Sequence, residues 1–240
     1  MTQTSARENL LRIQERIATA AARAGRRAEE ITLIAVSKTH PASAIHEAYE
    51  AGVRHFGENR VQEWEGKRTG TEGLAATWHL IGHLQSNKAA RAAKLFHSID
   101  SVDDFAIAQR LERARAEADD SDKLRVLIEV RVAPEETKSG VEISQLAALA
   151  EKFAELPRLE LAGLMCIPPF LEDAEGVRRY FRRLRELRED LTKKLGLGLP
   201  VLSMGMSHDF EVAIEEGATE VRVGTAIFGV REYSKESQGV

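Results

Sequence analysis

The sequence of 240 residues has a single cysteine, Cys166. One thiol cannot form an internal disulfide or a cysteine-based zinc site, and a chain without disulfides is typical of a reducing compartment. Cys166 is interpreted most simply as a small buried hydrophobic residue, although it follows a predicted strand and could lie near a functional site. The sequence therefore offers no thiol framework on which to build a function.

Long hydrophobic runs are also absent. The longest apolar stretch, 162–171, contains two prolines and is far shorter than the roughly 20 residues that cross a bilayer. Charged residues such as Arg7, Glu8 and Arg12 interrupt the first segment, which excludes the apolar core of a signal peptide. We therefore expect a cytoplasmic protein with no membrane segment.

Neither sign of charge dominates the composition. Lys and Arg number 34 against 38 Asp and Glu, which gives a net charge of −4. This balance provides no basic surface for nucleic acid or an anionic membrane. Hydrophobic residues make up 43% and charged residues 30% of the chain, as in a folded globular protein rather than a disordered one.

Familiar nucleotide and metal motifs are missing. There is no Walker loop and no G-x-G-x-x-G, because Gly196 and Gly198 only mark the turn before Pro200. His79 and His83 have the i, i+4 spacing of helical metal ligands, but they fall at a strand end and in a loop. With no HExxH motif and no carboxylate at a recognisable spacing, we expect no metal site.

What the sequence does contain is a repeated alternation of β-rich and helical segments. Residues 4–24 have apolar positions at a period near 3.6, which predicts an amphipathic helix ending at Gly25. The predicted strands are 31–37, 53–57, 77–81, 95–99, 124–130, 159–165, 199–203 and 220–223. Helices are predicted at 41–50, 60–68, 86–93, 103–118, 143–155, 174–194 and 208–216.

Strict alternation with short loops indicates parallel strands joined by right-handed crossovers. Eight such units in about 250 residues match the size of a TIM-type barrel. We therefore expect an α/β fold, one (β/α)8 barrel domain over residues 1–240, with an extra N-terminal helix and a polar tail from about residue 233. A doubly wound open sheet is the alternative that strand counting leaves open.

The functional site of a parallel barrel forms where its strands end. Lys38 follows the first strand, and a partly desolvated amine there is more readily uncharged and able to form a Schiff base with an aldehyde. Arg222 ends the eighth strand, where it could donate to a ring nitrogen or pair with a carboxylate. Asn59 and His79 end neighbouring strands and could flank a planar ligand. The alternatives are a solvated lysine at a strand end, a surface arginine, and structural hydrogen bonding by Asn59 and His79.

Small residues follow the last two strands. Ser203, Gly205 and Ser207 follow the seventh strand, and Gly224 and Thr225 follow the eighth at the start of a short helical turn. Small residues let the backbone approach a phosphate, hydroxyls donate to its oxygens, and a helix N-terminus adds its dipole. These two loops are the recurrent phosphate site of such barrels, so we predict a phosphate site, with ordinary turn chemistry as the alternative.

Five motifs, in order along nearly the whole chain, carry a resemblance to a known family. They are Ala35-Val-Ser-Lys-Thr39, Phe56-Gly-Glu-Asn-Arg-Val-Gln-Glu63, Trp78-His-Leu-Ile-Gly-His-Leu-Gln-Ser-Asn-Lys88, Leu202-Ser-Met-Gly-Met-Ser207 and Val221-Arg-Val-Gly-Thr-Ala-Ile-Phe-Gly229. On these motifs the sequence closely resembles the YggS / PROSC family of pyridoxal phosphate homeostasis proteins. The family fold is similar to the N-terminal barrel of alanine racemase, fold type III of the pyridoxal phosphate proteins.

The resemblance implies pyridoxal 5′-phosphate (PLP) as the cofactor, held by Lys38 as a Schiff base. Ser203, Gly224 and Thr225 would bind its phosphate. Arg222 would face the pyridine nitrogen. These implied roles agree with the positions of the same residues at predicted strand ends.

Further residues are implied in the surroundings of the cofactor. Asn59 would lie along it, with Met204 and His79 in the surrounding shell. The sequence departs from the family pattern at Arg131, in a segment where the family often has Asn, and at His208, where it often has an acidic residue. Both positions fall near strand ends, so we expect them to affect affinity and partner contacts rather than cofactor binding itself.

The resemblance implies a carrier or buffer of PLP that influences amino-acid and keto-acid metabolism. An arginine at the pyridine nitrogen weakens the electron sink of the cofactor, and racemisation needs a second base on the opposite face of the substrate. In the racemases that base is a tyrosine from a separate domain, which we expect this chain to lack. Its own Tyr49, Tyr180 and Tyr233 fall in helical segments or the tail.

Two enzymatic alternatives stay open. The chain could be a PLP-dependent amino-acid racemase or lyase, or a phosphosugar barrel with a Schiff-base lysine. The expected partners are PLP itself and PLP-requiring apo-enzymes, and we expect a monomer that binds neither nucleic acid nor membrane.

Overall fold

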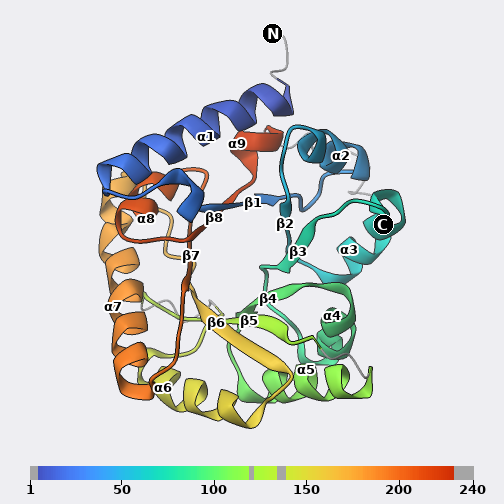
Figure 1. Cartoon of the computed structure of the whole chain (residues 1–240), viewed down its shortest axis with the longest axis vertical. Helices are drawn as coiled ribbons and strands as arrows, with labels where there is room; N and C mark the ends of the chain where they lie inside the picture. The colour runs from blue at the N-terminus through green and yellow to red at the C-terminus, as the bar shows by residue number, and fades with distance from the viewer. Residues whose placement is uncertain (1–4, 119–121, 134–138, 230–240) are drawn as a thin grey trace, which may run out of the picture.

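The computed structural model describes residues 5–118, 122–133 and 139–229. Within these ranges, eight parallel strands close into a barrel in the order β1 to β8, and β8 pairs with β1 (Figure 1). The strands are β1 (Thr32–Val36), β2 (His55–Glu58), β3 (Thr77–Leu80), β4 (Ser98–Val102), β5 (Leu124–Glu129), β6 (Leu159–Met165), β7 (Val201–Met206) and β8 (Glu220–Val223). The predicted (β/α)8 barrel is confirmed, and the open-sheet alternative is wrong.

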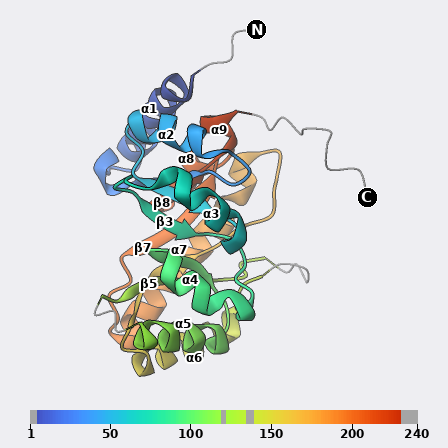
Figure 2. The same cartoon turned by 90° about the vertical axis from the view of Figure 1, so that its right-hand side faces the viewer.

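Helices surround the barrel on its outer side (Figures 1 and 2). They are α1 (Ala6–Arg23), α2 (Ala42–Glu50), α3 (Val61–Arg68), α4 (Ala89–Leu95), α5 (Phe105–Glu117), α6 (Ile143–Lys152), α7 (Arg178–Leu195), α8 (Phe210–Glu215) and α9 (Thr225–Phe228). Short 3₁₀ turns are η1 (Ala28–Glu30), η2 (Thr69–Thr71), η3 (Ser86–Lys88), η4 (Phe153–Glu155) and η5 (Ala174–Val177). No helix in these ranges is both long and apolar enough to span a membrane.

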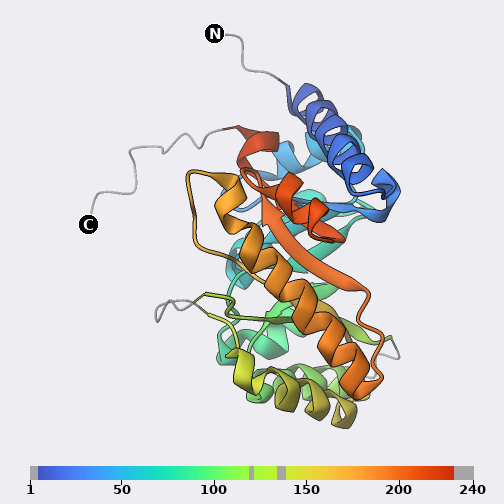
Figure 3. The ribbon, with the colours of Figure 1, turned by 90° about the vertical axis from the view of Figure 1, so that its left-hand side faces the viewer.

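The extra helix α1 is the predicted addition in front of the first strand. It starts with a capping box, in which Ser5 accepts from the Glu8 N–H and Glu8 accepts from the Ser5 N–H. One face of α1 carries Leu10, Ile13 and Ile17, all buried. This face packs on α8 and α9, so the first and last helices lie side by side (Figure 3).

Element boundaries differ from prediction mainly at two strands. Strand β4 was predicted at 95–99 but spans Ser98–Val102, because α4 continues to Leu95, the first residue assigned to the strand. Strand β7 extends to Met206, three residues beyond the predicted end. The predicted polar tail lies outside the described residues.

Alternate strand residues face opposite sides of the barrel wall. Ala35 and Phe56 belong to the main core, which the strands share with the helices. On the inner side, a Cβ on Gly57 would lie 3.0 Å from both Ile34 Cγ2 and Ile81 Cδ1. This alternation decides which side chains reach the barrel interior and its mouth.

Candidate functional site

A buried guanidinium lies at the carboxyl-terminal mouth of the barrel. Arg222 on β8 is only 3% exposed. Its Nη1 donates to Ser203 Oγ on β7, and its Nη2 donates to the Cys166 carbonyl oxygen after β6, both at 2.8 Å. Both acceptors are neutral, and within the described part of the chain no carboxylate lies within 4.0 Å of this guanidinium. A buried cation held in this way can favour a ligand acceptor beside it.

The loops after β7 and β8 form a cup of small residues. The Gly224 N–H donates to Ser207 Oγ at 3.3 Å, and the Ala226 N–H lies 3.5 Å from the same oxygen. A Cβ on Gly224 would lie 3.3 Å from both Cβ and O of Val36, so this loop packs directly against the end of β1. Thr225 is exposed at the start of α9. The cup therefore lies beside the turn that follows β1.

That turn carries Lys38, two residues beyond Val36 at the end of β1. Thr39 has a φ of 66°, and it alone among the described non-glycine residues has a positive φ. Such a conformation is costly for a β-branched residue and needs support from its surroundings. The Thr39 N–H donates to the carboxylate of Glu63 on α3, which supplies that support.

A buried ion pair between Lys67 and Glu58 also stabilises the turn after β1. Lys67 Nζ donates to the Ser37 carbonyl oxygen at 2.9 Å and to the two oxygens of Glu58 at 3.0 and 3.2 Å. It also donates to Glu63 Oε1 at 2.7 Å, and Ser37 Oγ donates to Glu58 at 2.7 Å. Burial raises the pKa of Glu58, although the charge of Lys67 opposes this effect. Partial burial also acts to raise the pKa of Glu63, but hydrogen bonds from Lys67 and the Thr39 N–H lower it overall.

Glu58 and Lys67 were not among the predicted site residues. Two signals in the sequence pointed to them. Glu58 is a carboxylate at the end of an apolar strand, where a charge needs a partner. Glu63 and Lys67 have the i, i+4 spacing of a helical ion pair.

The structure places His79 in a different polar cluster, inside the barrel toward the amino ends of the strands. Its Nδ1 lies 3.0 Å from Asp100 Oδ2, and its Nε2 lies 3.1 Å from His55 Nδ1. Arg125 donates to Glu220 Oε1 at 2.5 Å and lies 4.0 Å from Asp100. Ligand atoms of His79, Asp100 and Glu220 lie within 4.8 Å of one another, with Arg125 already supplying a positive charge there. Among the residues that the structure describes, no hydrogen bond joins this cluster to the guanidinium of Arg222 at the mouth.

The remaining predicted residues take varied positions. The side chain of Met204 is buried in the core that the barrel shares with the helices. Asn59 is half-buried directly after β2. Cys166 is fully buried, and burial raises the pKa of its thiol to about 12, so its carbonyl oxygen rather than its sulfur serves the site. Arg131 pairs with Glu142.

The sequence matches known proteins over nearly its whole length. Residues 9–232 match the family model for the alanine racemase N-terminal domain. The pyridoxal phosphate homeostasis protein of Aquifex aeolicus is 48% identical over 226 residues, which cover 94% of this chain and 98% of that protein. The corresponding protein of Escherichia coli is 45% identical over 236 residues, covering 95% of this chain and 97% of that protein.

A solved structure leads to the same family. PipY of Synechococcus elongatus, described with PLP bound, superposes with a TM-score of 0.79 at 41% identity, covering 89% of this chain and all of that chain (100%). The chain, with its barrel mouth of lysine, buried arginine and small-residue loops, belongs to the family of pyridoxal phosphate homeostasis proteins, built on the alanine racemase N-terminal domain.

Proposed function

We propose that this protein binds PLP at the barrel mouth and holds it for intracellular distribution, rather than turning over amino acids. One observation carries the proposal: Arg222 is a buried cation that donates to two neutral acceptors at the barrel mouth. The ring of PLP would lie beside it. The curated relatives are named for PLP homeostasis, and the PipY structure is described with PLP bound. These names support the same ligand at the same kind of barrel.

The residues at the mouth fit the chemistry of PLP. Lys38 would hold the aldehyde covalently, because it lies in the turn directly after β1, next to the loop of Gly224 that packs on Val36. Gly224 and Thr225 would bind the phosphate together with Ser207, whose hydroxyl already lies at the start of α9. When bound, PLP supplies a reactive aldehyde and an electron-withdrawing ring.

One predicted residue, Ser203, takes an adjusted role in this proposal, and three keep the roles that the resemblance implies. Ser203 is fully buried and accepts from Arg222, so we assign it to orienting the guanidinium rather than to the phosphate. Asn59 is half-buried at the end of β2 and would lie along the ring. His79 and Met204 would not contact the cofactor and would lie behind the residues that do.

Retention rather than turnover follows from two features of this mouth. A guanidinium donates to a ring nitrogen and leaves it unprotonated, which weakens electron withdrawal from a bound amino acid. The tyrosines within the described residues, Tyr49 and Tyr180, pack against the helix-side core. Neither supplies a base on the face opposite Lys38. The monomeric state, transfer to apo-enzymes and cytoplasmic location stay predictions.

The binding proposal is tested by reconstitution with PLP. Wild-type protein should develop the visible band of a lysine-bound cofactor, and borohydride reduction should fix one cofactor on Lys38, located by peptide mass analysis. Lys38→Ala should lose both signals, while the matched control Lys94→Ala, at an exposed position on α4, should keep them. A band and an adduct of normal size in Lys38→Ala would overturn the proposal.

The choice between carrier and enzyme needs a separate measurement. PLP-loaded protein is incubated with single L-amino acids in deuterated water, and deuterium at Cα is followed with chiral analysis. We expect no more exchange than one equivalent per protein. Exchange that exceeds the protein concentration, with racemisation, would identify an enzyme.

A further inference from the structure

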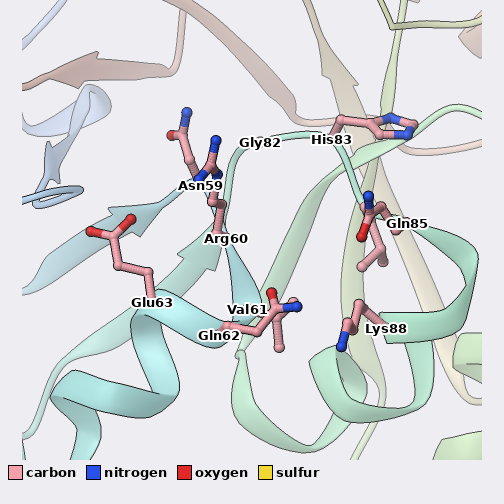
Figure 4. A pocket seen from close by; sticks show the side chains of 10 residues that line it. Asn59, Arg60, Val61, Gln62, Glu63, Gly82, His83, Gln85 and Lys88 are labelled. Carbon is pink, nitrogen blue, oxygen red and sulfur yellow. The ribbon is translucent and has the colours of Figure 1, made fainter. Parts of the chain in front are cut away.

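A cavity of about 760 Å³ opens beside the mouth, between the loop after β2 and the loop after β3 (Figure 4). Its volume falls within the range of small-molecule sites, roughly 300–1,000 Å³. Asn59 alone among the predicted PLP-binding residues lines it. Its remaining walls come from the start of α3 and from the segment around η3, neither of which the proposed cofactor site uses.

Two basic side chains give this cavity positive charge. The side chains of Arg60 and Lys88 line it from opposite walls and form no hydrogen bond or ion pair with the residues that the structure describes. The one carboxylate in the lining, Glu63, is already engaged by Lys67 and by the N–H of Thr39. Arg60 also attracts Glu63 through space, beyond ion-pair distance.

Nearby groups do not cancel this charge. His83 also lines the cavity, but its ring lies 3.6 Å from the carboxylate of Asp103 and points away from the centre (Figure 4). Within the described ranges, Arg60 and Lys88 thus lie on facing walls with no hydrogen bond or ion pair to their side chains. Such a pair suits a ligand carrying a compact double negative charge.

Amide side chains add hydrogen-bonding capacity between the cations. Gln62 extends from α3 toward Gln85 and Lys88 on the opposite wall (Figure 4). Each primary amide offers two donors and an acceptor, which suits hydroxyl or carbonyl groups of a small polar molecule. The lining therefore presents both an anion site and polar groups to orient the rest of a ligand.

The walls of the cavity are held in place. Gly82 packs against the neighbouring loop so closely that a Cβ would lie 2.5 Å from the Asn59 carbonyl oxygen. The Ser101 hydroxyl fixes the same glycine by donating to its carbonyl oxygen at 2.7 Å. A preformed cavity loses little free energy to ordering when a ligand binds.

We propose that this cavity is a second binding site, for a small organic phosphate monoester. The phosphate lies between Arg60 and Lys88, and its polar body contacts Gln62 and Gln85. The shared wall residue Asn59 and the Glu63 contact to Thr39 connect this site to the turn that carries the cofactor lysine. The site itself does not depend on PLP binding at the mouth.

The test is a calorimetric titration of PLP-loaded protein in phosphate-free, low-salt buffer. Loading fills the mouth, and the visible band is recorded throughout to show that it stays filled. Glycerol phosphate is the probe, with inorganic phosphate and succinate as comparison arms. We expect saturable binding of glycerol phosphate, weaker binding of inorganic phosphate, which lacks the polar body, and no saturable binding of succinate.

A double variant assigns the site. Arg60→Gln/Lys88→Gln removes one charge from an exposed position and one from a half-buried position, and we expect affinity for glycerol phosphate to fall on the order of tenfold or more. Lys94→Gln, an exposed lysine on α4 outside the cavity, is the control and should bind as wild type does. Circular dichroism confirms that all variants are folded.

Three outcomes would overturn the inference: equal affinity in wild type and the double variant, no saturable binding of glycerol phosphate, or tighter binding of succinate. Loss of the visible band during the titration would place the probe at the mouth and would also overturn it. Failure of the protein to take up PLP is recorded by the band alone. Failure to take up PLP would count against the proposed function. The difference in glycerol phosphate affinity between wild type and the double variant would still test the second site.

Discussion

Replacing Lys67 with methionine tests whether a buried ion pair stabilises the barrel mouth. The side chain of Lys67 is 12% exposed, and its ammonium donates to Glu58, to Glu63 and to the Ser37 carbonyl oxygen. Methionine has a similar length but carries no charge and no donor. The substitution therefore leaves Glu58, whose side chain is fully buried, without its cation.

The magnitude follows from the burial of that carboxylate. Removing one partner of a buried pair costs about 3–5 kcal/mol, because the other charge stays buried and uncompensated. Burial already raises the pKa of Glu58 above its ordinary value of 4.5, and loss of Lys67 should raise it further. A higher pKa makes the carboxyl of the variant easier to protonate than that of the wild type, which limits the loss of stability as the pH falls.

The sign of the pH dependence follows from this raised pKa. A carboxyl with a folded pKa above its unfolded value of 4.5 stabilises the folded state fully below that value, and the contribution is lost as pH rises through the folded pKa. Because the rise is larger in Lys67→Met, the cost of the substitution should be smaller in acid than in mild alkali. In acid, the proton on Glu58 replaces part of the stabilisation that the Lys67 ammonium supplies in wild type.

Urea unfolding at about pH 5 and about pH 8 measures both effects. Lys94→Met, at an exposed site on α4, is the control and should stay within about 0.5 kcal/mol of wild type. In the Glu58→Gln background, Lys67→Met should cost much less stability than it does in the wild-type protein. A cost below about 1 kcal/mol at the higher pH, or an equal cost at both, would refute the argument.

Three further predictions concern single residues. Burial lowers the pKa of His55 from 6.5 to about 4, so wild type should lose stability relative to His55→Gln as the pH falls from 6.5 to about 4. His83→Gln is the control. Stability profiles of wild type and His55→Gln that stay parallel over this pH range would contradict the prediction. Gly82→Ala should cost about 1–3 kcal/mol in urea unfolding, because its Cβ would meet a backbone oxygen, whereas Gly66→Ala, in open space within α3, should stabilise the fold by about 0.5–1 kcal/mol. The native thiol of Cys166 should react with a disulfide reagent only as fast as the protein unfolds, and fast labelling without denaturant would show that the mouth exposes it.

The sequence predicted the barrel well because each βα unit carries its own periodic signal. Strand β6 was predicted at its observed bounds, Leu159–Met165, and the strand starting at Glu220 likewise. The shift at β4 arose where alanine-rich helix α4 runs into the strand with no glycine or proline between them. Without such a residue, local pattern does not fix where one element ends.

Among the site residues, those at strand ends were predictable and those that support them were not. Arg222 and Ser203 follow from position alone, since neighbouring parallel strands end together. Their third contact, the Cys166 carbonyl oxygen, is a backbone group that no side-chain pattern reveals. The same holds for Lys67, whose contact with the Ser37 carbonyl oxygen depends on how α3 packs under the first turn.

The polar cluster inside the barrel shows the physical limit of such prediction. Each charge in it interrupts an apolar strand, which signals a buried partner but not which one. Arg125 on β5 and Glu220 on β8 lie 95 residues apart on strands that are not neighbours, yet they join at 2.5 Å across the interior. That contact joins strands that are not hydrogen-bonded neighbours in the closed barrel, so no pattern within a strand or a pair of adjacent strands could identify it. A charge reversal exchanging the two residues should therefore preserve the fold better than either single reversal, because the closed barrel, not the local sequence, specifies the pair.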